Sequence, residues 1–381
     1  MWLRGMLDGS HPTVVPSDFV MIEDQSSEAI AASLSIITQT WLFEGVPIRV
    51  GQVEFVGTDV TARGYGLARM AMKWFEQRAL EKGCLLGCVQ GIPTFYQKLG
   101  YHFAVDLKGG MRLGVDQVPF VLANDQVSVA PLGEDAYAEA VALHNATLRF
   151  LAVRSEMTLP LWQYQEQQSA ESEHAYETFG LRSEEKLVGY VRLQRFSRLN
   201  ALVVRECAFT TYAALVHGLV WIAQLARQRS FSSVVLQLPT GHPAVQLAQT
   251  WGAQAIQPYA WQVRVFDWAT FFAMATPVLE RRLAMSFLHD LTGAIIIHLS
   301  DENTNWRFLF TQGRLTSVAQ EEAHGTWHLK VPRSLLTALV LGYRARINLE
   351  HAYLETQSDP GSRYILDILF PSRESFVYEV Y

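Results

Sequence analysis

Apolar residues along the first part of the chain recur at the spacings of strands and helices. Between 67 and 82 they recur every three or four residues, which predicts a helix that ends at Gly83. Glu44 and Gly45 form a turn between two β-rich segments, as in a hairpin. The predicted elements are strands at 19–23, 28–43 and 46–58, a helix at 67–82, a strand at 84–89, a short helix at 94–99 and a strand at 102–107.

A second unit begins near 127, and from its three strands at 176–208 onward it repeats the order of elements in the first unit, with little sequence identity between the two copies. The second unit has a strand at 127–131, helices at 135–150 and 157–168, strands at 176–182, 186–194 and 201–208, a helix at 212–229, a strand at 234–238, a helix at 242–251 and a last strand at 261–266. A third unit begins near Pro277, with a helix at 279–288, strands at 293–299, 306–311 and 314–319, and a helix at 332–341. We therefore predict three domains, at 1–125, 126–275 and 276–381.

Composition narrows the class of protein. A chain of 381 residues is too long for one ordinary core. The net charge is −6 and no long run of Lys or Arg occurs, which argues against a nucleic-acid partner. No apolar stretch is long enough to cross a bilayer, so we expect no membrane partner. Cys84, Cys88 and Cys207 are too few for a disulfide framework, and we expect buried thiols in a cytoplasmic protein.

One loop carries a chemical signal. Arg63-Gly64-Tyr65-Gly66-Leu67-Ala68 lies between a predicted strand and a predicted helix. Its glycines allow the backbone to turn several N–H groups toward one point, and the helix N-terminus also favours an anion. Arg63 adds a positive charge. A diphosphate fits such a loop.

Two other nucleotide sites match this loop poorly. A nicotinamide site needs a third glycine and an acidic residue after the next strand, and the strand at 84–89 is followed by neither Asp nor Glu. The Gly-Lys-Ser/Thr of a P-loop is also absent from the sequence. His324 and His328 are four residues apart but have no third ligand nearby, so we predict no metal site.

The loop and its surroundings resemble a known family. The pattern Arg-x-x-Gly-x-Ala after the strand ending in Val56-Gly57-Thr58 is similar to the acyl-CoA signature of the GNAT superfamily of N-acetyltransferases. Within that superfamily, 56–58 and the segment Phe95-Tyr96-x-x-x-Gly100-Tyr101 resemble the Eis (enhanced intracellular survival) group. The resemblance is strong over 45–105 and looser beyond.

The resemblance implies a fold and a domain order. The fold class is α/β (α+β), with tandem GNAT folds that each contain a mixed, mostly antiparallel sheet flanked by helices. The domain at 1–125 would hold the acyl-CoA site, the domain at 126–275 would be a degenerate second copy, and the domain at 276–381 would be a small α+β fold like a sterol carrier protein. Whether that last domain binds lipid is left open.

The resemblance also implies roles for individual residues. Tyr96 would protonate the leaving thiolate, and the carboxylate of Tyr381 would act as the base, with Glu54 or water as alternatives. The pantetheine arm and the pyrophosphate of acetyl-CoA would be bound by Val56, Gly57, Thr58, Arg63, Gly64, Tyr65, Gly66, Leu67, Ala68, Arg69, Gly91 and Ile92.

The expected function is transfer of an acetyl group from acetyl-CoA to a primary amine by direct attack in a ternary complex. The acceptor would be a polyamine, an aminoglycoside-like molecule or a lysine, and relatives of this type form homo-oligomers. The alternative is a non-catalytic scaffold that binds acyl-CoA or lipid. Phe209-Thr210-Thr211 replaces the glycine loop in the second unit, so we predict one acyl-CoA site per chain.

The first unit begins late in comparison with the second. Only eighteen residues precede Phe19, whereas the second unit has a strand and two helices in the corresponding place. Those elements commonly form one wall of the acceptor cleft. We therefore expect either a truncated start or an unusually open acceptor site.

Overall fold

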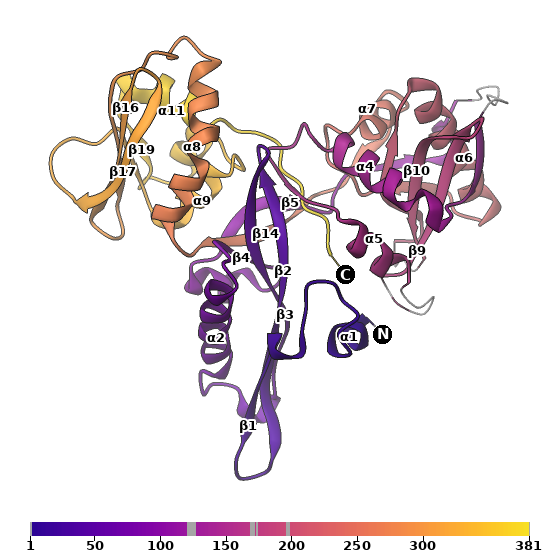
Figure 1. Cartoon of the computed structure of the whole chain (residues 1–381), viewed down its shortest axis with the longest axis horizontal. Coiled ribbons are helices and arrows are strands. Elements are labelled where there is room, and N and C mark those ends of the chain that lie inside the picture. The colour runs from indigo at the N-terminus through magenta and orange to yellow at the C-terminus, as the bar shows by residue number, and fades with distance from the viewer. Residues whose placement is uncertain (1, 120–126, 168–171, 173, 196–198, 381) are drawn as a thin grey trace.

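The residues that the structure describes form three β-sheets, arranged as the three lobes seen in Figure 1. The computed structural model describes residues 2–119, 127–167, 172, 174–195 and 199–380. Each sheet combines antiparallel pairs with one parallel pair. The prediction of an α/β fold with mixed, mostly antiparallel sheets flanked by helices is confirmed.

The first sheet has the strand order β1-β2-β3-β4-β14-β5, with β8 pairing to β2. Its strands are β1 (Phe19–Asp24), β2 (Ala29–Phe43), β3 (Val46–Thr58), β4 (Leu86–Val89), β5 (His102–Leu107), β8 (Val153–Ser155) and β14 (Tyr259–Val265). The helices of this part of the chain are α1 (Trp2–Leu7), α2 (Leu67–Glu81) and α3 (Pro93–Tyr96), and the last continues into the 3-10 turn η3 (Gln97–Leu99).

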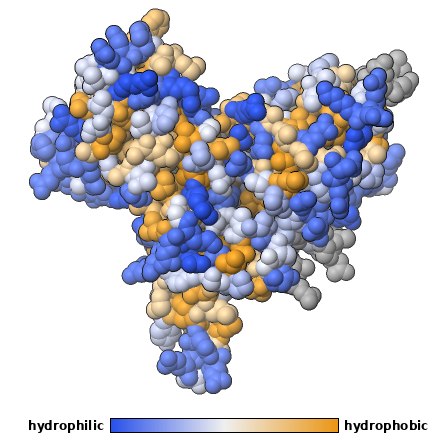
Figure 2. All heavy atoms as spheres, viewed as in Figure 1, coloured by the Kyte–Doolittle hydropathy of each residue, from blue (hydrophilic) through white to orange (hydrophobic). Residues whose placement is uncertain are grey.

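Local sequence explains the main features of this lobe. Glu44 and Gly45 both have positive φ, 45° and 90°, which matches the twist of a tight hairpin between β2 and β3. Helix α2 buries Ala71 and Phe75 on one face, against β2 and β3. Gly83, with φ 73°, follows the end of α2. The long β1–β3 arm extends away from the other two lobes and ends in a polar tip in Figure 2.

The second sheet has the order β13-β6-β12-β11-β10-β9-β7. Its strands are β6 (Met111–Gly114), β7 (Val127–Pro131), β9 (Tyr176–Ser183), β10 (Lys186–Gln194), β11 (Leu202–Phe209), β12 (Ser233–Leu236) and β13 (Gln254–Ala255). The helices of this lobe are α4 (Tyr137–Thr147), α5 (Leu159–Glu166), α6 (Tyr212–Gln228) and α7 (Pro243–Thr250).

The third sheet has the order β17-β16-β15-β18-β19. Its strands are β15 (Gly293–Leu299), β16 (Thr304–Thr311), β17 (Arg314–Glu322), β18 (Leu329–Val331) and β19 (Gln357–Ser358). The helices are α8 (Trp268–Ala284), α9 (Arg333–Val340), α10 (Arg346–Ala352) and α11 (Arg363–Leu369).

Three strands lie in a different sheet from the one that chain order suggests. The strand predicted at 261–266 was expected to close the second unit, but β14 lies between β4 and β5 in the first sheet. Conversely, β6 follows β5 in the chain but pairs with β12 in the second sheet. Strand β8, which lies between α4 and α5 in the chain, also pairs with β2 in the first sheet. The first sheet thus contains two strands from the second unit, β8 and β14, while β6 belongs to the second sheet. The pattern of apolar residues predicts that a strand is buried but does not specify its partners.

The predicted helix at 279–288 is also wrong in its start. Helix α8 begins at Trp268, where the Asp267 carboxylate accepts hydrogen bonds from the N–H groups of Ala269 and Thr270 at 3.0 and 3.2 Å. Pro277 lies inside this helix and does not begin it. The predicted boundary at 275/276 falls within α8, and the boundary at 125/126 lies outside the described residues. The domain limits themselves stay predictions.

The segment 375–380 connects the three lobes. It leaves the third lobe, runs through the middle of the molecule and ends near the start of the chain (Figure 1). The Phe376 N–H donates to the Val153 carbonyl at 2.9 Å, and the Val377 N–H donates to the Asp106 carbonyl at 3.1 Å. The Trp261 indole donates to the Val377 carbonyl at 3.0 Å. The segment therefore lies between β5 and β8 and contacts the exchanged strand β14.

The other end of the chain meets this segment. Nε2 of His11 lies 3.2 Å from the Val380 carbonyl. Burial lowers the pKa of His11 to about 4, although the hydrogen bond to Val380 opposes the shift. His11 is therefore neutral at pH 7 and donates a ring N–H to that carbonyl.

A buried ion cluster fixes the segment. The Glu379 carboxylate lies 2.5 Å from Nη2 of Arg205 and 2.8 Å from Nζ of Lys108, and accepts a hydrogen bond from Gln90 at 3.0 Å. Burial alone would raise the pKa of Glu379, but Arg205, Lys108 and the hydrogen bonds outweigh it and lower this pKa to about 2. The ionised carboxylate thus joins the second lobe to the end of β4.

This lowered pKa predicts an acid-dependent contribution to stability. Because the folded pKa lies below the unfolded value, the contribution is present above about pH 5 and is lost as the pH falls toward 2. At pH 7 we expect Glu379→Gln to lower stability by about 3 kcal/mol, since Arg205 loses a buried partner. The difference in melting temperature between the two proteins should shrink between pH 5 and pH 2. A difference that is the same at every pH would contradict the assignment.

Candidate functional site

The loop before α2 has the backbone geometry of an anion site. Gly64 and Gly66 have φ values of 90° and 79°, and no atom lies within 4 Å of where a Cβ would stand at either position. A side chain at either position would meet no steric obstacle. The two positions therefore favour glycine only because of their left-handed backbone conformation. Gly66 is the N-cap of α2 and supplies no side-chain acceptor. The first N–H groups of the helix are left for an external acceptor.

Strand β3 contains a bulge beside this loop. In the β2–β3 pairing, Ser33 is opposite Gly57 and Ser35 is opposite Glu54, so β3 carries one extra residue there. Phe55 has φ 52°, the left-handed conformation that accommodates the bulge. The parallel β3–β4 pairing ends at Val53. Beyond that point Val56, Gly57 and Thr58 continue without β4 beside them in the described structure.

The end of β4 is held by the exchanged strand. The Tyr259 hydroxyl accepts from the Gly91 N–H at 3.2 Å and donates to the Gly91 carbonyl at 3.0 Å. Gln262 also donates to that carbonyl, at 3.2 Å. Both side chains come from β14. They are functional candidates that the sequence did not reveal, because that strand was assigned to the second unit.

Tyr96 lies directly against Gly91. Gly91 has φ 143°, and a Cβ built on it would stand 2.9 Å from a ring carbon of Tyr96, so only glycine allows this approach. The Tyr96 side chain is 6% exposed, and its ring packs edge-on against Phe95 and Tyr101. Burial, and to a smaller extent the charges of Glu54 and Tyr259, raise the pKa of Tyr96 to about 12. Tyr96 is therefore a protonated phenol at neutral pH.

A line of polar side chains leads to Glu54. Gln39 donates to Oε1 of Gln52 at 2.7 Å, and Gln52 donates to Oε1 of Glu54 at 2.7 Å. Gln39 and Gln52 are both buried in the first sheet. Glu54 is partly buried on the bulged stretch of β3, and its charge acts on Tyr96. A carboxylate and a phenol thus interact electrostatically near the ends of β3 and β4.

All of the predicted site residues that the structure describes lie in one region. The residues 56–58, the loop 63–69, Gly91, Ile92 and Tyr96 all lie around the separated ends of β3 and β4 and the start of α2. Ile92 is largely exposed, and the Gly91 N–H is already bonded to Tyr259. Tyr381 lies outside the described residues, although Val380 beside it is buried.

Residues 209–211, at the corresponding place in the second unit, do not form such a loop. Thr211 is the N-cap of α6, and its hydroxyl accepts a hydrogen bond from the Ala214 N–H at 3.1 Å. The helix start that would face a phosphate is thus capped by its own side chain. This geometry supports the prediction that the acyl-CoA site occurs once per chain.

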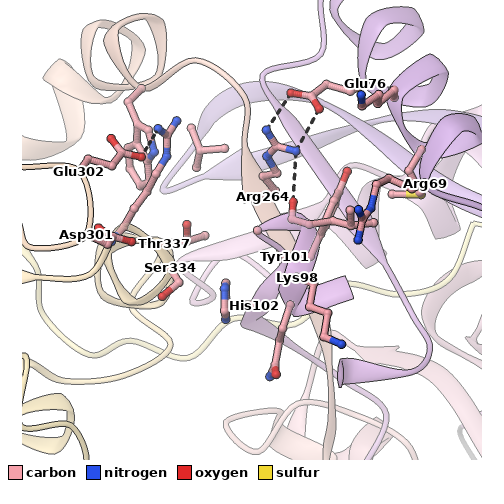
Figure 3. A pocket seen from close by; sticks show the side chains of 18 residues that line it. Arg69, Glu76, Lys98, Tyr101, His102, Arg264, Asp301, Glu302, Ser334 and Thr337 are labelled. Carbon is pink, nitrogen blue, oxygen red and sulfur yellow. Dashed lines mark hydrogen bonds and ion pairs between the residues drawn. The ribbon is translucent and has the colours of Figure 1, made fainter. Parts of the chain in front are cut away.

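A pocket of about 870 Å³ opens beside α2. Figure 3 shows its two walls, one from the first lobe and one from the third. The first wall carries Arg69 and Lys98, and the second carries Glu302 and Ser334. Arg264 of β14 binds both carboxylate oxygens of Glu76 at 2.9 Å within the first wall.

The two histidines singled out in the sequence have separate partners. Nδ1 of His328 accepts from the Ile296 N–H at 2.9 Å, and Nδ1 of His324 lies 2.6 Å from the Glu322 carbonyl. Among the described residues, no group of three or more His, Cys, Asp or Glu side chains could hold a metal ion. Nor does any helix in the described ranges have the length and apolar character needed to cross a membrane.

One family model matches the first part of the chain. Residues 5–104 match the family model described as an acetyltransferase (GNAT) domain. This range contains the separated strands, the glycine loop and Tyr96. Among curated proteins, none matches the sequence significantly.

Solved structures with a similar fold cover nearly the whole chain. A GCN5-related N-acetyltransferase from Anabaena variabilis has a TM-score of 0.73 at 14% identity, over 94% of this chain and 89% of that one. A probable N-acyltransferase of unknown function from Enterococcus faecalis has a TM-score of 0.70 at 16% identity, over 93% and 87%. Eis1 from Mycobacterium abscessus has a TM-score of 0.66 at 13% identity, over 94% and 90%.

The domain match and the shared fold agree with the geometry around β3, β4 and α2. GNAT acetyltransferases use acetyl-CoA as a co-substrate, and the match supports an acyltransferase activity. Residues 5–104 therefore match a GNAT acetyltransferase domain, and over 94% of its length the chain has a fold similar to that of Eis1 from Mycobacterium abscessus.

Proposed function

We propose that the protein transfers an acetyl group from acetyl-CoA to a primary amine, by direct attack of the amine in a ternary complex. The observation that carries the proposal is the pair of left-handed glycines, Gly64 and Gly66, at the open start of α2 inside the matched domain. The acceptor is a polyamine, an aminoglycoside-like molecule or a lysine.

The cofactor would occupy the gap that the bulge at Phe55 creates. Backbone groups of Val56, Gly57 and Thr58 are without β4 beside them, and the pantetheine arm of acetyl-CoA would bind there as an additional strand. The N–H groups of residues 64–69 and the charge of Arg63 would bind the pyrophosphate. Gly91 and Ile92 would line the other side of the arm. The thioester would then lie near Tyr96.

Tyr96 would stabilise the departing thiolate. The amine attacks the thioester carbonyl, the C–S bond breaks, and the sulfur leaves with the electron pair. Full proton transfer from a phenol with a pKa of about 12 to a thiolate with a pKa near 8.5 is uphill by roughly 5 kcal/mol. We therefore assign Tyr96 the role of hydrogen-bond donor to the sulfur, with net protonation completed by the proton that the attacking amine releases.

The base has two candidates among the carboxylates. Glu54 acts electrostatically on Tyr96 and is connected to the sheet by Gln52. The carboxylate of Tyr381 would follow the buried Val380 toward the same region. A lysine-like amine has a pKa of about 10.4, so the free energy of its deprotonation at pH 7 is roughly 4.6 kcal/mol. A nearby carboxylate or a water would accept the proton that the amine loses.

The remaining parts of the proposal concern the whole molecule. We propose that the third lobe, at 276–381, is a sterol-carrier-like domain that closes the acceptor side and carries the segment 375–380. We also propose a cytoplasmic protein that forms homo-oligomers. The alternative function, a scaffold that binds acyl-CoA or lipid without turnover, uses the same cofactor geometry.

The first prediction concerns cofactor binding. Calorimetry should detect one acetyl-CoA per chain, because the start of α6 is capped by Thr211. Gly66→Asp should abolish this binding, since its charge repels the pyrophosphate while Asp tolerates the left-handed conformation. Gly66→Asn is the matched control with the same shape and no charge, and it should retain most of the binding. Absence of acetyl-CoA binding to the parent protein would refute the proposal.

The second prediction separates the enzyme from the scaffold. Release of CoA should be measured with polyamines, aminoglycosides and lysine peptides as acceptors. Tyr96→Phe should reduce kcat by 10²-fold or more, because the thiolate loses its donor, while acetyl-CoA binding stays unchanged. Acetyl-CoA binding without turnover for any acceptor in the parent protein would favour the scaffold.

The third prediction concerns the exchanged strand. Tyr259→Phe removes both hydrogen bonds to the Gly91 backbone. We expect kcat to fall about tenfold with a small change in melting temperature, because Gly91 positions Tyr96 and water replaces the lost bonds at this exposed glycine. Tyr212→Phe alters an exposed tyrosine of α6 and should change neither quantity. An unchanged kcat in Tyr259→Phe would show that Gly91 needs no support from β14.

A further inference from the structure

The pocket beside α2 contains an imbalance of charge. Arg69, Lys73 and Lys98 line it from α2 and η3. None of the three has an acidic partner within ion-pair distance in the part of the chain that the structure describes, whereas other charges in the pocket are paired. Glu76 is neutralised by Arg264, and Glu302 lies 2.6 Å from Arg333. The protein as a whole carries a net charge of −6, whereas this pocket has three cations without an acidic partner among the described residues.

The position of these cations connects the pocket to the cofactor loop. Arg69 and Lys73 are four residues apart and therefore lie on one face of α2. Arg69 is in the first turn of that helix, directly after the loop 63–66. Lys98 approaches from η3, and in Figure 3 its side chain and that of Arg69 lie on the same wall. The cations thus begin about one helical turn from the proposed pyrophosphate site.

We propose that this pocket binds the adenosine 3′-phosphate of the acyl-CoA, with Lys73 and Lys98 as its main ligands and Arg69 shared with the pyrophosphate. This inference rests on the proposed acetyl-CoA site. The chemistry that recognises the ligand is a phosphate dianion next to three unpaired cations. The third lobe supplies the opposite wall through Ser334 and Thr337, so the adenosine end lies between two lobes.

The acidic side chains that the third lobe supplies to the pocket do not neutralise its three cations, because they lie on the opposite wall. Asp301 accepts a hydrogen bond from the Arg333 N–H at 3.0 Å, and Glu302 is paired with the Arg333 guanidinium. Both belong to the third-lobe wall, opposite the cations (Figure 3). The carboxylates are thus held away from Lys98 by contacts within their own wall.

The test is a cycle between protein charge and ligand charge. Calorimetry on the full chain would use CoA and 3′-dephospho-CoA as probes. For the parent protein we expect CoA to bind roughly tenfold more tightly, and the difference should shrink with added salt because the lysines are exposed. In the double variant Lys73→Gln and Lys98→Gln, CoA should bind only as tightly as dephospho-CoA, whose affinity should stay unchanged. Lys186→Gln, an exposed lysine in the second lobe, is the control and should preserve the tenfold preference.

The outcomes separate the two proposals. Equal affinity of the parent protein for CoA and dephospho-CoA would overturn the 3′-phosphate site and leave the cofactor site intact. An equal loss of affinity for both probes in the double variant would also overturn it, because the lysines would then act on the shared part of the ligand. Failure of both probes to bind the parent protein would overturn the cofactor site as well. Melting temperatures of the variants establish that the fold is retained.

Discussion

The Glu379 carboxylate, held between Arg205 and Lys108, is the contact on which the arrangement of the lobes depends. It belongs to the segment 375–380, whose neighbouring residues are buried in the cores of all three lobes. Removing two charges from water is expensive, so such a pair persists only where the surrounding structure holds both partners. Here Gln90, at the end of β4, supplies a further hydrogen bond. The same residue precedes Gly91, so the contact that joins the lobes also reaches the candidate site.

The candidate site also depends on a strand from a distant part of the chain. Strand β14 completes the first sheet, and its residues Tyr259 and Gln262 bind the Gly91 backbone. A family match that ends at residue 104 therefore covers the glycine loop and Tyr96 but omits the strand that positions them. The Tyr96 phenol receives its raised pKa mainly from burial, and Tyr259 on β14 adds electrostatically to the shift. The chemistry of the first lobe is thus partly determined by residues of the second.

Sequence patterns predict the local features well and the long-range ones poorly. The glycine loop at 63–66 is recognisable because positive φ is specific to few residue types, and both glycines adopt it. The absence of such a loop at 209–211 is equally local, and Thr211 caps α6 there. The partners of β14 are not recognisable, because a buried strand has the same alternation in any sheet. Nor does the sequence indicate the bulge at Phe55, since a non-glycine residue there has no distinctive signal.

The position of β14 in the first sheet has a consequence for biosynthesis. During translation β4 emerges about 170 residues before its neighbour β14, and at 5–20 residues per second this interval lasts roughly 10–30 s. Throughout that time β4 and β5 lack the strand that lies between them in the finished sheet. Unpaired strand edges invite pairing with other chains. We therefore expect the nascent first lobe to be open to incorrect strand pairing during this interval, and slow translation would lengthen it.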